Sequence, residues 1–359
     1  MKKFLFWTAL ASVALTGCVK NDVEPNPSLG QDVEITFNAP VVGKITKAHY
    51  GEIENATYPT TENFIVHAWA HEGNFDPDAS PAPVVYIDQQ ETTYFDGLGL
   101  TGPTGDAGTG TWRITPNHYY WPKTHNLTFT AYSPSAIYGY ASIDAKTGIK
   151  LTDVVIGNDV SKHIDILYSN RVFNQTYPTY KKENLERIGV DIQFHHALAS
   201  VRVMAKALEN YAPTTITINK IWFDNVEMKG TFTEDLVTGL ETSSTGSWST
   251  PTETNNDLDL KVEEAIITTT AEQYGCKALL IPQALDGNLN VTYTITNPKG
   301  TKIQETKAFK LSEQTSGLTP IDKWEQSKRY TYTLTFGLDK IYLAPQVDDW
   351  TPVESSITY

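Results

Sequence analysis

The chain has 359 residues, which is long enough for two domains. Its 40% hydrophobic content supports globular cores, and 23 Gly with 19 Pro are too few for a collagen-like or low-complexity chain. The net charge of -14 argues against a nucleic-acid-binding protein, because that function needs clustered Lys and Arg.

The first 18 residues have the pattern of a bacterial lipoprotein signal. Two lysines precede the apolar run 4–15, which is too short to cross a hydrocarbon core of about 30 Å and is typical of a signal peptide. The run ends in Thr16-Gly17-Cys18, where small residues precede a cysteine thiol that would receive diacylglycerol. We therefore expect residues 1–17 to be removed and Cys18 to be lipidated. An ordinary secretory signal with an incidental cysteine is the alternative.

The polar, proline-containing residues 18–30 predict a flexible tether. The only other cysteine is Cys276, so lipidation of Cys18 would leave it without an intramolecular partner. Because Cys276 begins an apolar run, we expect a buried, inert thiol.

A period-two pattern begins at residue 33 and predicts the first strand of the folded protein. Polar residues occupy one parity of this segment. The apolar residues of the other parity are expected to share one buried face. They are Val33, Ile35, Phe37, Ala39, Val41 and Ile45.

Two pairs of histidines and a glycine-rich stretch are candidate metal or cofactor sites. Residues 64–71 read as a strand, in which His67 and His71 would lie about 13 Å apart, too far for one ion. His195 and His196 are adjacent and would point to opposite sides of a strand. The glycines of residues 97–102 match a dinucleotide fingerprint in form only, because proline and further glycines follow where a helix must begin. No metal, cofactor or catalytic motif is therefore predicted, and no two carboxylates are singled out as a glycosidase pair.

The rest of the chain also predicts strands. Alternation marks residues 215–219 and 330–336, and residues 289–296 and 301–310 flank a hairpin turn at residues 297–300. Residues 197–209 could form a helix, although Val201 and Val203 favour a strand. The polar run 176–184 is the best domain boundary. The sequence thus predicts an all-β protein with two tandem β-sandwich domains, residues 31–182 and 183–359.

The acidic cluster at Asp348-Asp349-Trp350 is the last candidate site in chain order. In composition it resembles a sugar-binding cluster. An exposed acidic turn is the more ordinary interpretation.

Several motifs, in the same order along the chain, resemble the fimbrillin family of Bacteroidales, the lipoprotein pilins of type V fimbriae. They comprise the lipidation motif at Cys18, the first-strand segments 33–38 and 43–48, the segments 120–122, 127–134 and 194–199, and the C-terminal segments 324–332 and 347–350.

The resemblance implies two β-sandwiches of the transthyretin-like, Greek-key type, export to the outer membrane as a lipoprotein, and a final location in the surface fimbrium. It further implies proteolytic removal of the first strand and polymerisation by strand exchange. The partners would be other copies or related fimbrial subunits, the outer membrane through the lipid, and a host or bacterial surface receptor for adhesion. It implies neither enzyme activity nor a cofactor.

Specific residues follow from this resemblance. The family's maturation cut follows an arginine, but the first arginine here is Arg113, so Lys44 and Lys47 are the candidate cut sites. They can also be plain surface lysines. Burying four large residues of the first strand contributes at most ~6–12 kcal/mol. The candidate donor strand lies at the C-terminus and carries Val347, Trp350, Val353, Ile357 and Tyr359.

Two alternatives stay open from the sequence. The protein could be a lipid-anchored fimbrial anchor or accessory subunit that does not polymerise. It could also be a glycan-binding surface lipoprotein. In that case aromatic rings would stack on sugars, although core packing is the simpler interpretation. The rings in question are Tyr119, Tyr120, Trp121 and Tyr132.

Overall fold

The computed structural model describes residues 34–42, 58–95, 111–176, 189–235, 245–249 and 256–350. Cys18 and the leader, Val33, Lys44, Ile45, Lys47, Val353, Ile357 and Tyr359 lie outside the described residues. Within the described ranges, strands alternate with only three short 3-10 helices, so the all-β prediction is confirmed. None of the described helices combines the length and apolar character that a membrane span requires.

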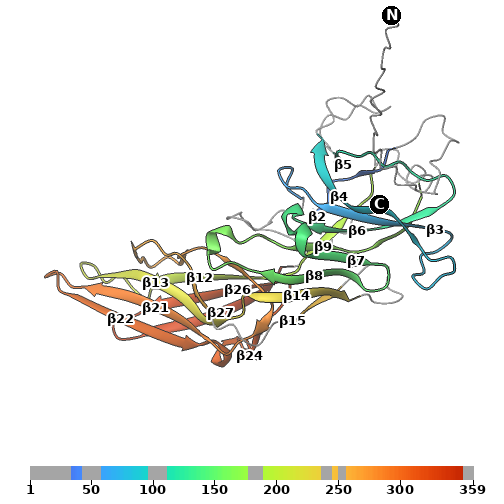
Figure 1. The fold of residues 1–359 in the computed structure, drawn as a ribbon. Helices are drawn as coiled ribbons and strands as arrows, with labels where there is room; N and C mark the ends of the chain where they lie inside the picture. Colours follow the sequence, from blue (N-terminus) through green and yellow to red (C-terminus); the bar gives the residue numbers. More distant parts are fainter. Residues whose placement is uncertain are drawn as a thin grey trace, which may run out of the picture.

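The N-terminal half is a nine-stranded sheet that the first segment of the chain closes (Figure 1). Its order is β1-β5-β4-β3-β6-β9-β11-β2, with β10 paired to β6. The strands are β1 (Thr36–Phe37), β2 (Val41–Val42), β3 (Ile65–His71), β4 (Val84–Phe95), β5 (Thr111–Ile114), β6 (Asn126–Ser133), β9 (Leu167–Ser169), β10 (Val172–Gln175) and β11 (Gln193–His196). Because β1 and β2 follow one another in the chain but stand at opposite ends of this order, residues 34–42 join the two ends of the sheet.

A four-stranded sheet, in the order β15-β14-β8-β7, combines strands from both halves of the sequence. It consists of β7 (Ala141–Asp144), β8 (Gly148–Val155), β14 (Lys229–Asp235) and β15 (Thr245–Ser249). Leu151 of β8 pairs with Phe232 of β14, and both side chains are fully buried in one core. The division predicted between residues 182 and 183 therefore does not separate the sheets. The polar composition of a segment does not tell which strands pair, because pairing is set by apolar residues far apart in the sequence.

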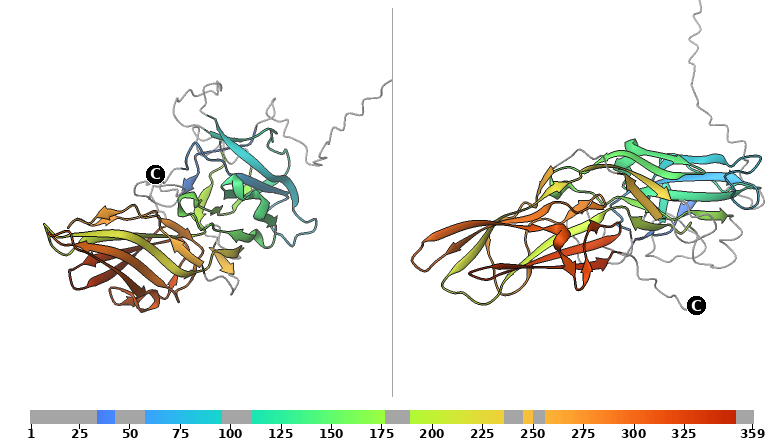
Figure 2. Two further views of the ribbon diagram at one scale, coloured as in Figure 1. Left: turned by 60° about the vertical axis from the view of Figure 1, so that its left-hand side comes forward. Right: turned by 90° about the horizontal axis from the view of Figure 1, so that it is seen from below.

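The C-terminal half contains two further sheets, which Figure 2 shows stacked on each other. One has the order β18-β12-β26-β27, with β19 beside β12, and the other has the order β16-β13-β21-β22, with β17 beside β13. The strands of the first sheet are β12 (Ala199–Ala207), β18 (Glu272–Gln273), β19 (Ala278–Leu280), β26 (Lys328–Phe336) and β27 (Ile341–Asp349). Those of the second sheet are β13 (Thr215–Val226), β16 (Asn256–Asp259), β17 (Ala265–Ile266), β21 (Asn288–Thr296) and β22 (Lys302–Lys310).

Aromatic side chains join these two sheets. The ring of Phe223 in β13 lies 6.0 Å from that of Tyr332 in β26, and Tyr293 in β21 lies 5.3 Å from Phe336 in β26. Such contacts between inner faces are what packs two sheets into a sandwich. Smaller elements complete the half: β20 (Gln283–Ala284) pairs with β25 (Lys323–Trp324), and β23 (Thr315–Ser316) with β24 (Thr319–Pro320). The 3-10 helices are η2 (Ser135–Tyr140), η3 (Val160–Lys162) and η4 (Leu311–Glu313).

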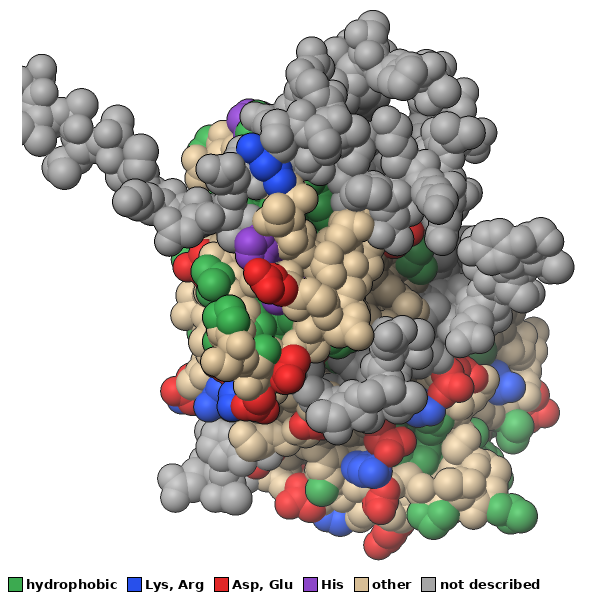
Figure 3. Space-filling model, turned by 90° about the vertical axis from the view of Figure 1, so that its right-hand side faces the viewer, with side chains coloured by type: hydrophobic (Ala, Val, Ile, Leu, Met, Phe, Trp, Pro, Cys, Tyr) green, Lys and Arg blue, Asp and Glu red, His purple; other side chains and the backbone are tan. Residues whose placement is uncertain are grey.

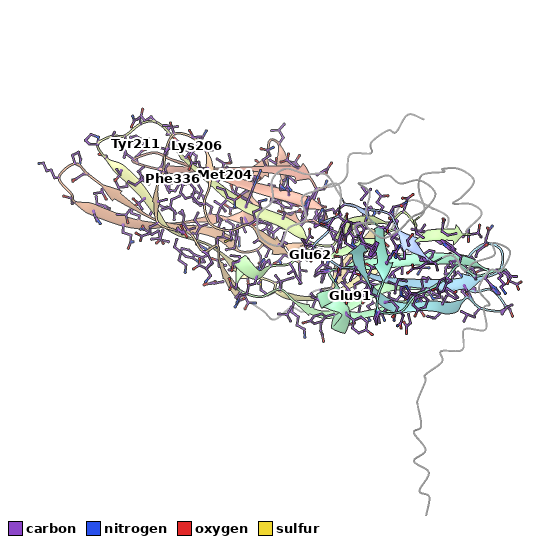
Figure 4. The ribbon with its side chains drawn as sticks, turned by 90° about the horizontal axis from the view of Figure 1, so that it is seen from above. Glu62, Glu91, Met204, Lys206, Tyr211 and Phe336 are labelled. Atoms are coloured by element: carbon purple, nitrogen blue, oxygen red, sulfur yellow. The ribbon has the colours of Figure 1, made fainter. Side chains whose placement is uncertain are left out.

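Two local predictions have clear outcomes here. The alternative of a helix at 197–209 is wrong, because β12 alternates buried and half-buried residues and pairs in parallel with β26, so that Met204 and Lys206 lie beside the strand that ends at Phe336 (Figure 4). The hairpin prediction is confirmed by β21 and β22, whose turn places Gly300 at φ 80°. That positive φ favours glycine.

Candidate functional site at the first and last strands

Residues 34–42 complete the hydrophobic core of the N-terminal sheet. Ile35, Phe37 and Val42 are each fully buried. The ring of Phe37 meets those of Phe64 and Phe129 edge-on, both at 5.8 Å between centroids. Edge-to-face packing of aromatic rings stabilises a core by more than the burial of their apolar surface alone.

The buried parity of this segment changes in its middle. Ala39 is exposed and Val41 is 47% exposed, whereas Pro40 and Val42 are buried. The expectation that Ala39 and Val41 share the buried face of Phe37 is therefore wrong. Pro40 has no N–H with which to continue a ladder, and beyond it the chain leaves β5 and pairs with β11 as β2.

The segment has a backbone neighbour on each side. On one side β1 runs antiparallel to β5, with Thr36 opposite Arg113. On the other side it runs parallel to residues 190–194: the N–H of Asn38 donates to the Val190 carbonyl at 3.0 Å, and the N–H of Val190 donates to the Thr36 carbonyl at 2.8 Å. Removal of the segment would thus leave two unpaired backbone edges, with which another strand can pair.

One polar side chain of the segment reaches into the neighbouring backbone. The Asn38 side-chain amide donates to the carbonyl of Gly189 at 2.9 Å and to Asp191 Oδ1 at 2.8 Å. Its oxygen accepts the N–H of Gly189 at 3.2 Å. Gly189 is buried, and a Cβ there would lie 2.5 Å from the Asn38 nitrogen, so only glycine allows this approach.

The start of the segment carries a charged contact. A Glu34 carboxylate oxygen lies 2.7 Å from Nδ1 of His118, and the other oxygen lies 3.7 Å from the Arg113 guanidinium. These side chains are exposed or half-buried, so their contribution to stability is small. Among the described side chains on the face seen in Figure 3, hydrophobic ones are interspersed with polar ones.

The C-terminal strand β27 is the edge of its sheet among the described residues. It pairs with β26 along its whole length, from Ile341 opposite Phe336 to Asp349 opposite Lys328. The Lys328 ammonium and the Asp349 carboxylate form an ion pair at its end. Val347, a candidate donor residue, is half-buried opposite Tyr330.

Trp350, directly after β27, is fully buried. Its ring stacks on that of His196 at 3.6 Å and 12°. The backbone N–H of Trp350 donates to the carbonyl of Ser327 at 2.7 Å. Nδ1 of His196 lies 2.8 Å from a carboxylate oxygen of the buried Asp165. The two aspartates are exposed as expected, but they lie in strand β27 and not in a turn. Trp350 belongs to the core.

The four candidate histidines lie in strands β3 and β11 of the N-terminal sheet. His67 and His71 are both buried, and burial lowers the pKa of His67 to about 4. Nε2 of His71 lies 2.9 Å from the Thr128 hydroxyl. His195 lies 2.7 Å from Asn170 and therefore points away from the Asp165 partner of His196, as expected for adjacent strand residues. Over the described ranges, no three His, Cys, Asp or Glu side chains gather as metal ligands do.

The remaining candidate side chains are structural. Trp121 and Tyr132 are buried and so are not presented to a sugar, while Tyr119 and Tyr120 are half-buried. Cys276 is a free thiol as expected, but it is half-buried rather than fully buried, and burial raises its pKa.

Sequence reasoning missed the partners that hold the two end segments. Asn38 was assigned to the polar parity without a role, and Gly189 and Asp191 were not considered. His196 was weighed as a metal ligand rather than as a platform for Trp350. The sequence offers only the alternation of apolar and polar residues here, and this alternation does not indicate which polar groups far apart in the chain are in contact.

These features define an all-β protein in which the first and last strands are the parts to be explained functionally. A family model described as fimbrillin-like matches residues 53–350, and the chain belongs to that family. The match begins after the first segment and ends at Trp350.

Two solved structures illustrate the likeness. A fimbrial protein from Bacteroides vulgatus has a TM-score of 0.56 at 16% identity, covering 88% of this chain and 99% of that one. The tip fimbrial protein Mfa3 from Porphyromonas gingivalis, with a C-terminal truncation, has a TM-score of 0.39 at 9% identity, covering 89% of this chain and 100% of that one. No curated protein matches this chain in sequence.

Proposed function

We propose that this protein is a structural subunit of cell-surface fimbriae that serves adhesion and assembles by strand exchange. It is exported as a lipoprotein through Cys18 to the outer membrane. A protease then cuts after Lys44 or Lys47, the segment 34–42 leaves, and a strand of another subunit takes its place. Membership of the fimbrillin-like family supports a fimbrial, non-enzymatic role at the cell surface.

The observation that carries the proposal is the position of residues 34–42. They close the N-terminal sheet between two neighbours and bury Ile35, Phe37 and Val42, yet they precede the rest of the fold in the chain. A single cut between Val42 and Tyr58 would detach them covalently without breaking any other described strand. Refilling of the resulting edges by a strand from another chain is a known mode of recognition.

Lys44 and Lys47 lie in this interval, whereas Arg113 does not. Arg113 belongs to β5, which pairs with both β1 and β4. A cut after Arg113 would therefore divide a strand of the sheet instead of releasing the first segment alone. This favours the two lysines as the cut sites of a strand-exchanging subunit.

The test compares the wild-type chain with a Lys44→Gln/Lys47→Gln variant in the native host. Surface material is separated by electrophoresis without boiling, and the N-terminus of each band is sequenced. We expect a ladder of multimers beginning after Lys44 or Lys47 in the wild type, and one band beginning at Cys18 in the variant. Lys299→Gln, in the exposed hairpin turn, is the matched control and should keep the ladder.

A single wild-type band that begins at Cys18 would contradict polymerisation. That result would favour the second candidate function, an outer-membrane anchor or accessory subunit that keeps its lipid. The absence of an arginine before Arg113 in the sequence is the observation that supports this alternative. A glycan-binding role is less favoured, because Trp121 and Tyr132 are buried.

A further inference from the structure

The slot that residues 34–42 occupy selects for more than apolar residues. Besides the space that its three buried side chains fill, it contains a buried glycine, Gly189, whose backbone N–H and carbonyl are both bonded to a side chain of the segment. We infer that the strand that refills this slot carries an amide residue directly beside a large aromatic one, as Asn38 stands beside Phe37. We further infer that the refilling strand belongs to a different subunit, not to a second copy of this chain. The inference rests on the proposed strand exchange.

The amide requirement follows from the bonding of Gly189. Both its N–H and its carbonyl are bonded to the Asn38 side chain, at 3.2 and 2.9 Å, and the residue is buried. A side-chain amide both donates and accepts, as a peptide group does, whereas a carboxylate only accepts. An aspartate at this position would leave the Gly189 carbonyl without this donor and would face the Asp191 carboxylate, which now accepts from Asn38 at 2.8 Å. Leaving a buried backbone group unpaired is costly.

The aromatic requirement follows from Phe37. Its ring is fully buried with its edges against Phe64 and Phe129. A smaller residue would leave a cavity among these rings, which close-packed cores do not tolerate well. Since Phe37 and Asn38 are neighbours in the chain, an incoming strand must offer the aromatic and the amide side by side, whichever direction it runs.

The C-terminal segment of the sequence, residues 341–359, lacks such a pair. Its three aromatic residues within 341–359 are Tyr342, Trp350 and Tyr359. Tyr342 is flanked by Ile and Leu, Trp350 by Asp349 and Thr351, and Tyr359 by a threonine. The single amide of the segment, Gln346, stands between Pro345 and Val347.

The largest aromatic residue of this segment is also already packed in the core of its own chain. Trp350 is fully buried on His196, and β27 pairs with β26 along its whole length. If Trp350 lay in the place of Phe37, its neighbour would be either Thr351 or Asp349. Neither provides an amide, and Asp349 would bring a second carboxylate to Asp191. In the proposed maturation each copy loses its own first segment, so a second copy would offer its C-terminal segment, which is a poor occupant of the slot.

The experiment uses the full chain with a specific protease site inserted between Lys47 and Ala48. After cleavage, the folded protein is incubated with fluorescent peptides and exchange is followed by anisotropy and mass spectrometry. The probes are the native peptide 33–42, the same peptide with Asn38→Asp or with Ala39→Ser, and the peptide 341–359. Ala39 is exposed in the slot, so Ala39→Ser is the matched control.

We expect the native and Ala39→Ser peptides to enter equally, within about twofold. The Asn38→Asp peptide and the 341–359 peptide should each bind at least roughly tenfold more weakly, as loss of a buried hydrogen-bond partner predicts. Entry of the 341–359 peptide as strong as that of peptide 33–42 would overturn the inference and leave strand exchange standing. Equal entry of the Asn38→Asp peptide would overturn the amide requirement. Failure of every peptide, with the cut segment retained, would overturn strand exchange and the inference together.

Discussion

The first segment, residues 34–42, and the last strand, β27, are both extended and nine residues long, yet they are held in different ways. The first segment has short pairings on two sides and three fully buried apolar side chains. Among the described strands β27 is hydrogen-bonded only to β26, in a continuous ladder, and its side chains are half-buried or exposed until Trp350. The ladder of β27 is thus the longer one, while the first segment has the deeper side-chain burial.

This difference separates two contributions to the stability of a strand in its sheet, the burial of its side chains and its backbone hydrogen bonds. Side-chain burial removes apolar area from water and dominates the stability of a folded chain. Ladder hydrogen bonds replace bonds to water, so each contributes only about 0.5–1.5 kcal/mol net. The site that the first segment vacates should therefore be the more demanding of what refills it, because three buried side chains must be matched.

The largest expected effect tests the burial of the first segment. Phe37→Ala should lower the free energy of unfolding by about 3–5 kcal/mol, because it leaves a cavity between aromatic rings. Denaturant unfolding measures it. Val41→Ala, in the same segment but at a 47% exposed position, is the control and should change the free energy by about 0.5 kcal/mol or less.

Equal losses for these two variants would contradict the change of parity at Pro40. That outcome would mean that the whole segment lies with one face inward, as its alternation alone indicates.

The second effect tests the anchor of the last strand. Trp350→Ala removes the ring that stacks on His196, and the loss should appear as local opening of β27, since regions of low stability open independently of the core. Hydrogen exchange should show faster exchange for the amides of β27, while those of β3 and β6 keep their protection. Tyr342→Ala, at a 44% exposed position in β27, should leave the exchange of the strand nearly unchanged.

Faster exchange in β3 and β6 as well would contradict this comparison. It would mean that Trp350 supports the N-terminal sheet, through His196 at the end of β11, and not only the last strand.

The same two regions show how far the sequence alone could predict the structure. Period-two patterns correctly predicted the strands β21 and β26. They failed at Pro40, where the chain exchanges one neighbour for another, because alternation carries no information about which strand lies beside it. Trp350 was predicted together with its exposed acidic neighbours, because nothing nearby in the sequence indicates the His196 ring that covers it.

The third effect is a pH dependence of the free energy of unfolding, which arises from a buried histidine in the N-terminal sheet. Burial lowers the pKa of His67 in β3 from its usual 6.5 to about 4. Between these values the unfolded chain binds more protons than the folded one, so stability is complete above pH 6.5 and is lost as the pH falls toward 4. The loss is at most about 3 kcal/mol. The free energy of unfolding, plotted against pH, should have a shallower slope for His67→Gln than for the wild type. An unchanged slope would contradict the buried neutral state of His67.

The smallest effect concerns the ion pair at the end of β27. Asp349→Asn removes the partner of Lys328, but the Asp349 side chain is 66% exposed, so we expect a loss of only about 0–1 kcal/mol. Because exposed charges are screened by salt, the difference from wild type should vanish at high ionic strength. Hydrogen exchange of β27 at low and high salt measures it. An effect that exceeds that of Trp350→Ala, or that persists in salt, would mean that charge rather than the buried indole fastens the last strand. The contrast between a strand held by one buried ring and a segment held by three buried side chains would then fail.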